Sequence, residues 1–225
     1  MIKFENTEVS GWESAIRGMR NPMNSWKKSD SRWEPQFDTE TGPCHGFFVI
    51  GPNDLNLMAR LRNAGTDHRK FMRMNTVYVD ITAPLYWWKE FDTYKVGTVA
   101  NSCSTMHKIA AKEFTPEDFS HEHLFTEENL RYEAEPDSLK LLNTIINALN
   151  VYRLAYLEEG DKSIWWQMIQ LLPSSYNQRR TVMLNYEVLA NIYKSRKNHK
   201  LDEWSVGFME WIESLPYSEL ITGED

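Results

Sequence analysis

The sequence predicts an α/β protein in which helices outnumber strands. Apolar residues recur at helical spacing over several stretches, of which residues 139–159 are the longest. Strand-like alternation is confined to short segments, and residues 74–82 show it best. With 225 residues, 41% of them hydrophobic, the chain can bury a substantial core, and its length fits one elaborated domain, residues 1–225, better than two.

The N-terminal half alternates between strand and helix patterns. Residues 2–5 suggest a strand, and residues 10–19 an amphipathic helix that Ser10 caps, with Glu13 three residues later. A polar, proline-containing loop follows to about residue 45. The remaining elements of this half are a strand at 46–50, a helix at 53–63 ending before Gly65, a strand at 74–82 closed by Pro84, a helix from 87 to 91 and a loop of small residues at 97–104.

The C-terminal half is predicted to be mainly helical. An acidic stretch at 115–138 contains two helix starts, at Thr115 and Thr126. The helix at 139–159 carries an apolar stripe, on which Arg153 also falls, so this arginine needs a partner anion or a route to solvent. Further helices are predicted at 163–171, over a long segment after Ser174, and at 202–214.

The long segment after Ser174 places polar groups where a helix should be apolar. Drawn at about 100° per residue, its apolar side chains form a broad arc that includes Asn185 and Arg196. A buried guanidinium without a partner destabilises the fold by roughly several kcal/mol. Arg196 therefore either reaches solvent at the helix end or meets an anion brought in from outside.

The spacing of polar residues in this segment is the strongest functional signal. Leu172-Pro173 is followed by Arg179 six residues after the proline, by Asn185 twelve after it, and by Arg196 eleven beyond Asn185. This spacing resembles the C-terminal signature of the flavin-dependent thymidylate synthases, the ThyX family. The resemblance implies that Arg179 and Arg196 hold the phosphate and base of a deoxyuridylate, and that Asn185 and Asn191 contact flavin.

A second region, upstream, resembles the same family. Residues 57–65, Phe71 and residues 76–88 look like its helix, glycine turn, strand and Ala-Pro turn, which lead to a signature motif of Arg-His-Arg with a serine beyond it. Asn101 and Ser104 match family positions. The resemblance implies that Asn101 contacts the cofactor and Ser104 the nucleotide.

The signature motif itself is altered. Thr93-Tyr94-Lys95 stands where the family has Arg-His-Arg, Glu90 where it has glutamine, and Met106 where it has arginine. Lys95 supplies a point charge in place of a planar fork that binds two acceptors; it and Glu90 are expected to contact the nucleotide. Glu187 replaces an arginine of the flavin helix, and Phe71-Met72-Arg73 replaces a Phe-Glu-His element.

The resemblance implies a ThyX-like α/β (α+β) fold, with a small antiparallel sheet flanked by helices, and a homotetramer with ligand pockets at subunit interfaces. We expect a nucleotide-binding ThyX-like protein whose methylating reaction is lost or altered, so that it sequesters a nucleotide or modifies it differently. FAD is the cofactor the family implies, and the altered motif argues against its retention.

Two alternatives stay open. In the first alternative, the chain is a divergent flavin-dependent thymidylate synthase, a methyltransferase-like enzyme that converts dUMP to dTMP with folate and NADPH, and Lys95 takes the place of the missing arginine. In the second, it is a structural oligomer, in which Arg179 and Arg196 pair with carboxylates of a neighbouring chain.

Composition excludes several other classes. A net charge of −7 argues against binding of nucleic acid polymers, which need a basic surface, although local basic groups can hold one nucleotide. Cys44 and Cys103 give no disulfide framework and are expected to be unpaired thiols. The histidines show no recognised metal spacing. No targeting or membrane segment is visible, which predicts a cytoplasmic protein without a membrane partner.

Overall fold

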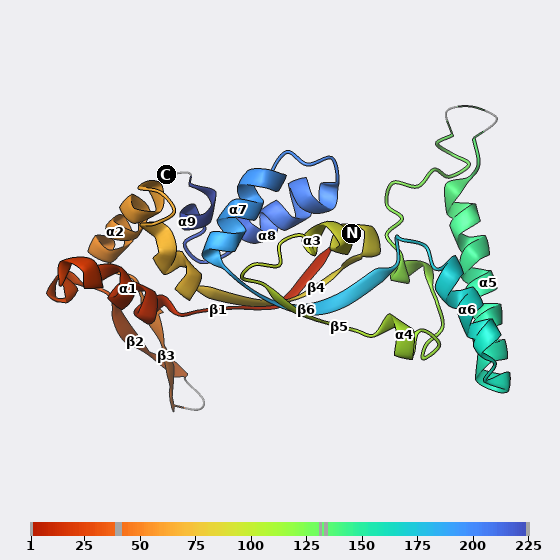
Figure 1. Cartoon of the computed structure of the whole chain (residues 1–225), viewed down its shortest axis with the longest axis horizontal. Coiled ribbons are helices and arrows are strands. Elements are labelled where there is room, and N and C mark those ends of the chain that lie inside the picture. Colours follow the sequence, from red (N-terminus) through yellow and green to blue (C-terminus); the bar gives the residue numbers. More distant parts are fainter. Residues whose placement is uncertain (1, 39–41, 131, 133–134, 224–225) are drawn as a thin grey trace. The chain divides into compact units, whose positions relative to one another are not determined.

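The computed structural model describes residues 2–38, 42–130, 132 and 135–223; the side chains of residues 36–45 lie outside the description. Four strands form the main sheet in the order β1-β4-β6-β5, namely β1 (Lys3–Ser10), β4 (Thr76–Pro84), β6 (Asn177–Asn185) and β5 (Val99–Ser102). A second, two-stranded antiparallel sheet pairs β2 (Arg32–Asp38) with β3 (Gly42–Val49). The predicted small antiparallel sheet with flanking helices is confirmed (Figure 1).

The chain divides into two compact units, each assembled from separated segments. The first comprises Met1–Glu5, Asp80–Thr93 and Ala100–Thr181, and the second comprises Asn6–Val79, Tyr94–Val99 and Val182–Asp225. Four of the five boundaries, at residues 5/6, 79/80, 99/100 and 181/182, fall inside a strand of the main sheet, and the fifth, at 93/94, falls in the segment after α3 (Leu85–Phe91). Neither unit therefore corresponds to one half of the sequence.

The first unit contains the longest helix. Its helical elements are α3 (Leu85–Phe91), α4 (Thr105–Lys108), η4 (Pro116–Asp118), α5 (Ser138–Glu159) and α6 (Lys162–Leu171). Helices α5 and α6 lie side by side and cover a core that includes Phe119, Leu149 and Met168 (Figure 1). Within the described residues, the Nε of Arg153 on α5 is buried and has no hydrogen-bond partner. The side chain as a whole is partly exposed.

The second unit carries the remaining helices and the β2–β3 hairpin. Its helical elements are α1 (Trp12–Arg20), η1 (Asn21–Met23), η2 (Trp26–Lys28), α2 (Pro52–Asn63), η3 (Arg69–Met74), α7 (Tyr186–Arg196), η5 (Glu203–Phe208), α8 (Met209–Glu213) and α9 (Glu219–Thr222). Its core is rich in fully buried large side chains, among them Met58, Tyr186, Trp204 and Phe208. Element η5 is a turn of π-helix, so the helix predicted at 202–214 changes its hydrogen-bond pattern along its length.

Several expectations about secondary structure are wrong. No helix starts at Thr126, where residues 127–129 form a turn. The helix predicted after Ser174 begins only at Tyr186, because residues 177–185 form β6 and hydrogen-bond to β4 and β5. The predicted loops at 20–45 and 97–104 contain β2 with the start of β3, and β5, respectively. In each of these strands, pairing with another strand overrides a weak local preference.

Ser10 does not cap α1, although the sequence predicts that it does. It ends β1, and its hydroxyl hydrogen-bonds to the Thr76 hydroxyl at 2.8 Å. Gly11 precedes the helix instead, with φ of +94°. A Cβ at Gly11 would lie 2.0 Å from the Met74 carbonyl oxygen, so this position requires glycine.

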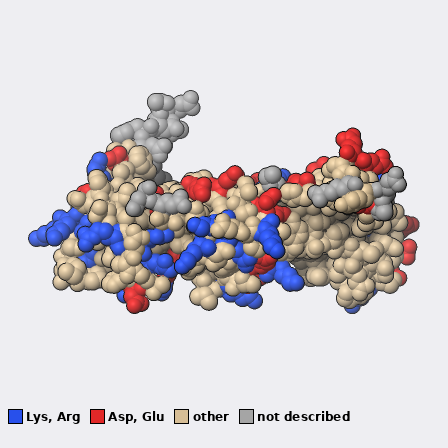
Figure 2. Space-filling model, turned by 90° about the horizontal axis from the view of Figure 1, so that it is seen from above, with Lys and Arg blue, Asp and Glu red and all other residues tan. Residues whose placement is uncertain are grey.

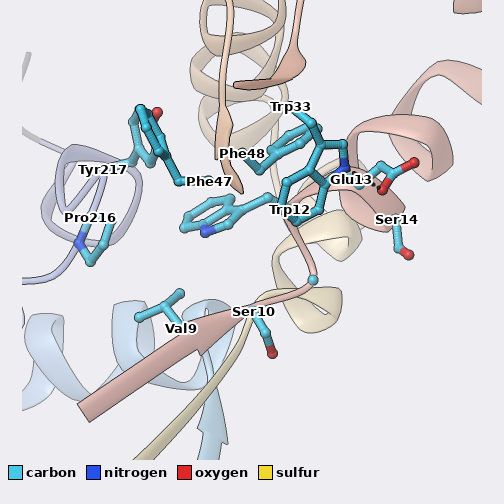
Figure 3. Close-up of a pocket in the computed structure, with 11 residues that line it drawn as sticks. Val9, Ser10, Trp12, Glu13, Ser14, Trp33, Phe47, Phe48, Pro216 and Tyr217 are labelled. Carbon is cyan, nitrogen blue, oxygen red and sulfur yellow. Dashed lines mark hydrogen bonds between the residues drawn. The ribbon is translucent and has the colours of Figure 1, made fainter. Parts of the chain in front are cut away.

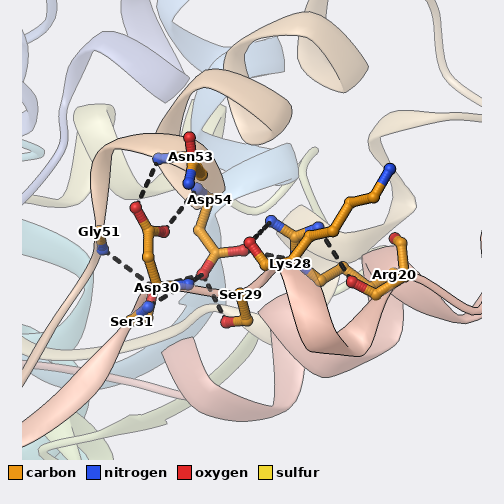
Figure 4. A network of polar contacts seen from close by, with 9 residues as sticks. Arg20, Lys28, Ser29, Asp30, Ser31, Gly51, Asn53 and Asp54 are labelled. Atoms are coloured by element: carbon orange, nitrogen blue, oxygen red, sulfur yellow. Dashed lines mark hydrogen bonds and ion pairs between the residues drawn. The ribbon is translucent and has the colours of Figure 1, made fainter.

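A buried ion pair joins α1 to α2 in the second unit (Figure 4). Arg20 Nε donates to Asp54 Oδ1 at 2.6 Å, and both side chains are almost fully buried. Asp54 Oδ2 accepts hydrogen bonds from the hydroxyls of Ser29 and Ser31, each at 2.6 Å. Burial raises the pKa of Asp54, but these hydroxyls and Arg20 outweigh it and hold the pKa below its usual range. The network fixes the segment from Ser29 to Ser31 against the start of α2.

No helix among the described residues is long and apolar enough to cross a membrane.

Candidate functional site

Two of the predicted nucleotide contacts, Ser104 and Arg179, line the same pocket in the first unit. The pocket has a volume of about 380 Å³. The residues that follow β5 and those of β6 line it together, because the Cys103 N–H donates to the Arg179 carbonyl at 2.9 Å. Ser104 follows at once as the cap of α4 and accepts a hydrogen bond from the His107 N–H at 3.1 Å.

Further polar side chains line this pocket. Lys108 is exposed, whereas Lys112 forms an ion pair with Asp118. Gln178 Nε2 donates to the Cys103 carbonyl at 2.9 Å and to the Thr105 hydroxyl at 3.2 Å. Glu117 and Asp118 also line the pocket. Lys108, Arg179 and the hydroxyls are the groups that suit an anion carrying hydrogen-bonding oxygens.

Arg179 already has carboxylate partners within its own unit. Its Nη2 donates to Asp80 Oδ2 at 2.8 Å, and its Nη1 lies 3.2 Å from Glu5 Oε2. The hydrogen bond to Asp80, with the charge of Glu5, raises the pKa of Arg179. An incoming anion must compete with these two carboxylates for the guanidinium.

Sequence reasoning missed Asp80. The signal was present, because Asp80 lies between the buried residues Val79 and Ile81 of an alternating strand and so occupies the opposite face. On that face it reaches both Arg179 and the hydroxyl of Thr181 on the adjacent strand β6. What the sequence lacks is the strand order that makes β4 and β6 neighbours.

The other two site residues predicted in the first unit do not line this pocket. Glu90 is partly buried on α3, and its carbonyl accepts from the Thr93 N–H at 3.1 Å and the Thr93 hydroxyl at 2.7 Å. Asn101 is exposed on β5. Their assignment to the nucleotide and the cofactor stays a prediction.

Arg196 in the second unit is held by residues of its own chain. Its Nε donates to the Tyr94 hydroxyl at 2.8 Å, and its guanidinium carbon lies 5.1 Å from the centre of the Trp204 ring. A hydroxyl and aromatic faces thus accommodate this partly buried charge. Tyr94 belongs to the altered motif Thr93-Tyr94-Lys95, so this motif contacts the C-terminal signature through the bond between Tyr94 and Arg196. Lys95 is exposed beside it.

The predicted flavin contacts Asn185 and Asn191 also have partners in this unit. Asn185 Oδ1 caps α7 by accepting from the Val188 N–H at 3.1 Å. Asn191 Oδ1 accepts from Arg69 Nη2 at 3.1 Å. Gly97, with φ of +83°, passes so close to the start of α7 that a Cβ there would lie 3.1 Å from Asn185 Nδ2.

Two positions that depart from the family pattern bind each other. Glu187 is buried at the start of α7, and its carboxylate forms ion pairs with Arg69 at 3.4 Å and with Arg73. The hydrogen bond to Glu187 raises the pKa of Arg73. Helix α7 thus presents an acidic group that is neutralised from η3, at the position where the family resemblance predicts an arginine.

The fold defined by this sheet and these helices is that of the flavin-dependent thymidylate synthases. The ThyX of Helicobacter pylori complexed with FAD and dUMP is 17% identical and aligns with 99% of this chain and 98% of its own, at a TM-score of 0.66. The UMP/dUMP methylase PolB of Streptomyces cacaoi bound with 5-Br UMP is 14% identical, covering 99% and 93%, at 0.59. No family model and no curated protein matches the chain.

Proposed function

We propose that this chain is a nucleotide-binding protein of ThyX fold whose methylating reaction is lost or altered. The observation that carries the proposal is the pocket in which Ser104 and Arg179 lie together with the exposed Lys108. A nucleoside monophosphate offers a phosphate for the two cations and polar atoms for the hydroxyl. Solved structures of the same fold hold dUMP or 5-Br UMP.

We extend the proposed nucleotide contacts to Arg196, Lys95 and Glu90 on the family resemblance. The Nε of Arg196 donates to the Tyr94 hydroxyl, and an anionic ligand would compete for the guanidinium with its partners in the chain. We further propose that residues 1–225 act as one ThyX-like domain, since four of the five unit boundaries fall inside strands of the main sheet.

FAD fits the assigned residues poorly. The Oδ1 atoms of Asn185 and Asn191 are used within the chain, and Glu187 places a carboxylate where the family has an arginine. Glu187 offers no donor to the cofactor's phosphates, and its carboxylate engages Arg69 and Arg73. We therefore propose that nucleotide binding in this protein does not depend on FAD.

Substitution of either arginine tests the nucleotide site. Arg179→Ala and Arg196→Ala are each expected to weaken binding of a nucleoside monophosphate by about 1.5–3 kcal/mol, the range for a hydrogen bond to a charged group. Calorimetric titration with a panel of pyrimidine and purine monophosphates measures this. Arg32→Ala is the matched control, because Arg32 is exposed and pairs with Glu34. Unchanged affinity in both variants for every nucleotide that the parent binds would refute the assignment.

We also propose a homotetramer. Helix α5 exposes Leu141, Val151, Leu154 and Leu157, with relative exposures of 55%, 65%, 61% and 57%. Figure 2 shows few Lys or Arg side chains over the α5–α6 part of the first unit. Exposed apolar side chains clustered on one helix are typical of subunit interfaces.

Sedimentation at micromolar concentration is expected to show a species of about four times the chain mass of 26.5 kDa. Val151→Glu combined with Leu154→Glu should dissociate it, because buried unpaired carboxylates destabilise an interface. Lys140→Gln, on an exposed polar position of the same helix, should leave the assembly intact. A parent protein that sediments as a single 26.5 kDa species contradicts the tetramer.

The ion pairs of Arg179 with Asp80 and Glu5 favour one competing function, a structural oligomer that retains the fold without a ligand. Mass spectrometry of small molecules released from freshly purified protein separates the two. A released nucleotide supports the binder, whereas an empty extract together with no nucleotide binding by calorimetry supports the structural role.

A further inference from the structure

A second cavity, with five aromatic side chains among its eleven lining residues, lies wholly within the second unit (Figure 3). It has a volume of about 720 Å³, and Trp12, Trp33, Phe47, Phe48 and Tyr217 line it. They come from α1, from the β2–β3 hairpin and from the turn after α8. None of the residues assigned to the nucleotide or to flavin lines this cavity.

Four of the five aromatic rings contact one another in pairs, and two of the five are exposed. Trp12 meets Tyr217 edge to face, with ring centres 5.2 Å apart, and Trp33 meets Phe48 at 5.5 Å. Trp33 and Phe47 are nevertheless 59% and 51% exposed. Large rings held in place at a cavity while remaining exposed are typical of binding surfaces.

The backbone that carries the cavity is constrained on two sides. Gly11, whose φ of +94° and contact with Met74 admit no side chain, sets Trp12 as the first residue of α1. Tyr217 has φ of +55°, a conformation that costs a bulky residue about 1–3 kcal/mol. Such strain is found preferentially at ligand sites.

The charge of the cavity is acidic. Among the described residues that line it, the only charged side chain is Glu13. Trp33 Nε1 donates to Glu13 Oε2 at 3.1 Å, which holds the carboxylate at the rim (Figure 3). Within the described part of the chain no ion pair neutralises Glu13. Arg17 and Arg32 line a separate, adjoining cavity of about 320 Å³ that shares Glu13, Trp33 and Phe48 with this one.

We propose that this cavity binds a small organic cation through a methylated ammonium group. The negative faces of aromatic rings attract such a cation, and it forgoes little hydration because its methyl groups donate no strong hydrogen bonds. Glu13 supplies the opposite charge. The volume exceeds that of one ammonium head and lies in the range of small-ligand pockets, so the ligand carries a larger group beside the head.

The test compares choline with its neutral isostere, 3,3-dimethylbutan-1-ol, by titration of the full chain followed by tryptophan fluorescence and NMR. Choline is expected to bind roughly tenfold more tightly than the alcohol, since only choline carries the charge that the rings and Glu13 attract. Glu13→Gln should weaken choline binding several-fold and leave the alcohol unchanged. Trp33→Leu should weaken both ligands. The control, Trp166→Leu, removes a ring that is 43% exposed in the other unit and should change neither.

Equal affinity for choline and the alcohol, or no choline binding up to tens of millimolar in folded protein, would overturn the proposal. A peptide carrying trimethyl-lysine distinguishes a free amine from a polypeptide source. Weaker or equal binding of that peptide supports the small-molecule assignment, and binding of the peptide far more tightly than choline contradicts it. Circular dichroism of each variant confirms that the loss of affinity is not a loss of fold.

Discussion

Ordinary methylation of dUMP is expected to be absent from this protein or slower than in the family by several powers of ten. Thr93-Tyr94-Lys95 replaces Arg-His-Arg, Met106 replaces an arginine, and Tyr94 is engaged in holding Arg196. Loss of groups that stabilise developing charge lowers a rate by about two to three powers of ten for each donor. The assay measures dTMP formed from dUMP, methylenetetrahydrofolate and NADPH with added FAD.

An authentic flavin-dependent thymidylate synthase run in parallel is the positive control, and the flavin absorbance of the purified protein is recorded alongside. Multiple turnovers at a rate typical of the family would mean that Lys95 and its neighbours have taken over the missing roles. In that case the divergent synthase replaces the nucleotide binder as the preferred function. Lys95→Ala would then abolish the activity, whereas the exposed Lys197→Ala would not.

Asp54→Ala is expected to lower the free energy of unfolding by about 3–5 kcal/mol, because it leaves the buried guanidinium of Arg20 without its counter-ion. The hydroxyls of Ser29 and Ser31 also lose their acceptor. Urea denaturation followed by circular dichroism measures the change. Glu34→Ala, which removes an exposed carboxylate from a surface pair with Arg32, should cost less than about 1 kcal/mol. Equal effects of the two substitutions would contradict the structural role of Asp54.

The stabilisation by Asp54 has a defined pH dependence. Its pKa in the folded protein lies below the ordinary value of 3.8, so the folded state favours the charged carboxylate. The contribution is complete above that ordinary value and is lost as pH falls through the lower folded pKa. The difference in unfolding free energy between the parent and Asp54→Ala should accordingly be constant near neutral pH and shrink below about pH 4. A difference that persists unchanged to pH 2 would mean that packing, not charge, accounts for it.

The elements that are local in sequence were predictable. The helices at 53–63 and 139–159 follow from spacing alone. Strand β6 was not predictable, because the residues that it contacts are distant in sequence. Arg179 and Thr181 on β6 donate hydrogen bonds to Asp80, which lies 99 and 101 positions away, respectively. The bond between Tyr94 and Arg196 spans 102 positions. No periodicity reveals which distant strand or loop will supply a partner.

The aromatic cavity was even less predictable from the sequence than strand β6. Trp12, Trp33, Phe47 and Tyr217 have no shared spacing, and each alone is most simply a core residue. Only the positions of Gly11 and the β2–β3 hairpin bring them to one cavity. Strand β2 and the start of β3 lie in a segment predicted as loop, since its polar residues and Pro35 mask the alternation. The rest of β3 falls in the strand predicted at 46–50.

The ion pairs of Glu187 also limit the substitutions that this chain can accept in evolution. Glu187→Arg alone would set a third guanidinium beside Arg69 and Arg73 in a buried position, with no carboxylate between them. Changing Arg73 first would leave Glu187 with one of its two cations. Each single step passes through a less stable protein, so the effect of a substitution at one position depends on the residue at the other. A lineage that carries these ion pairs is therefore held to them by epistasis, and replacing Glu187 by arginine requires coordinated changes on α7 and η3.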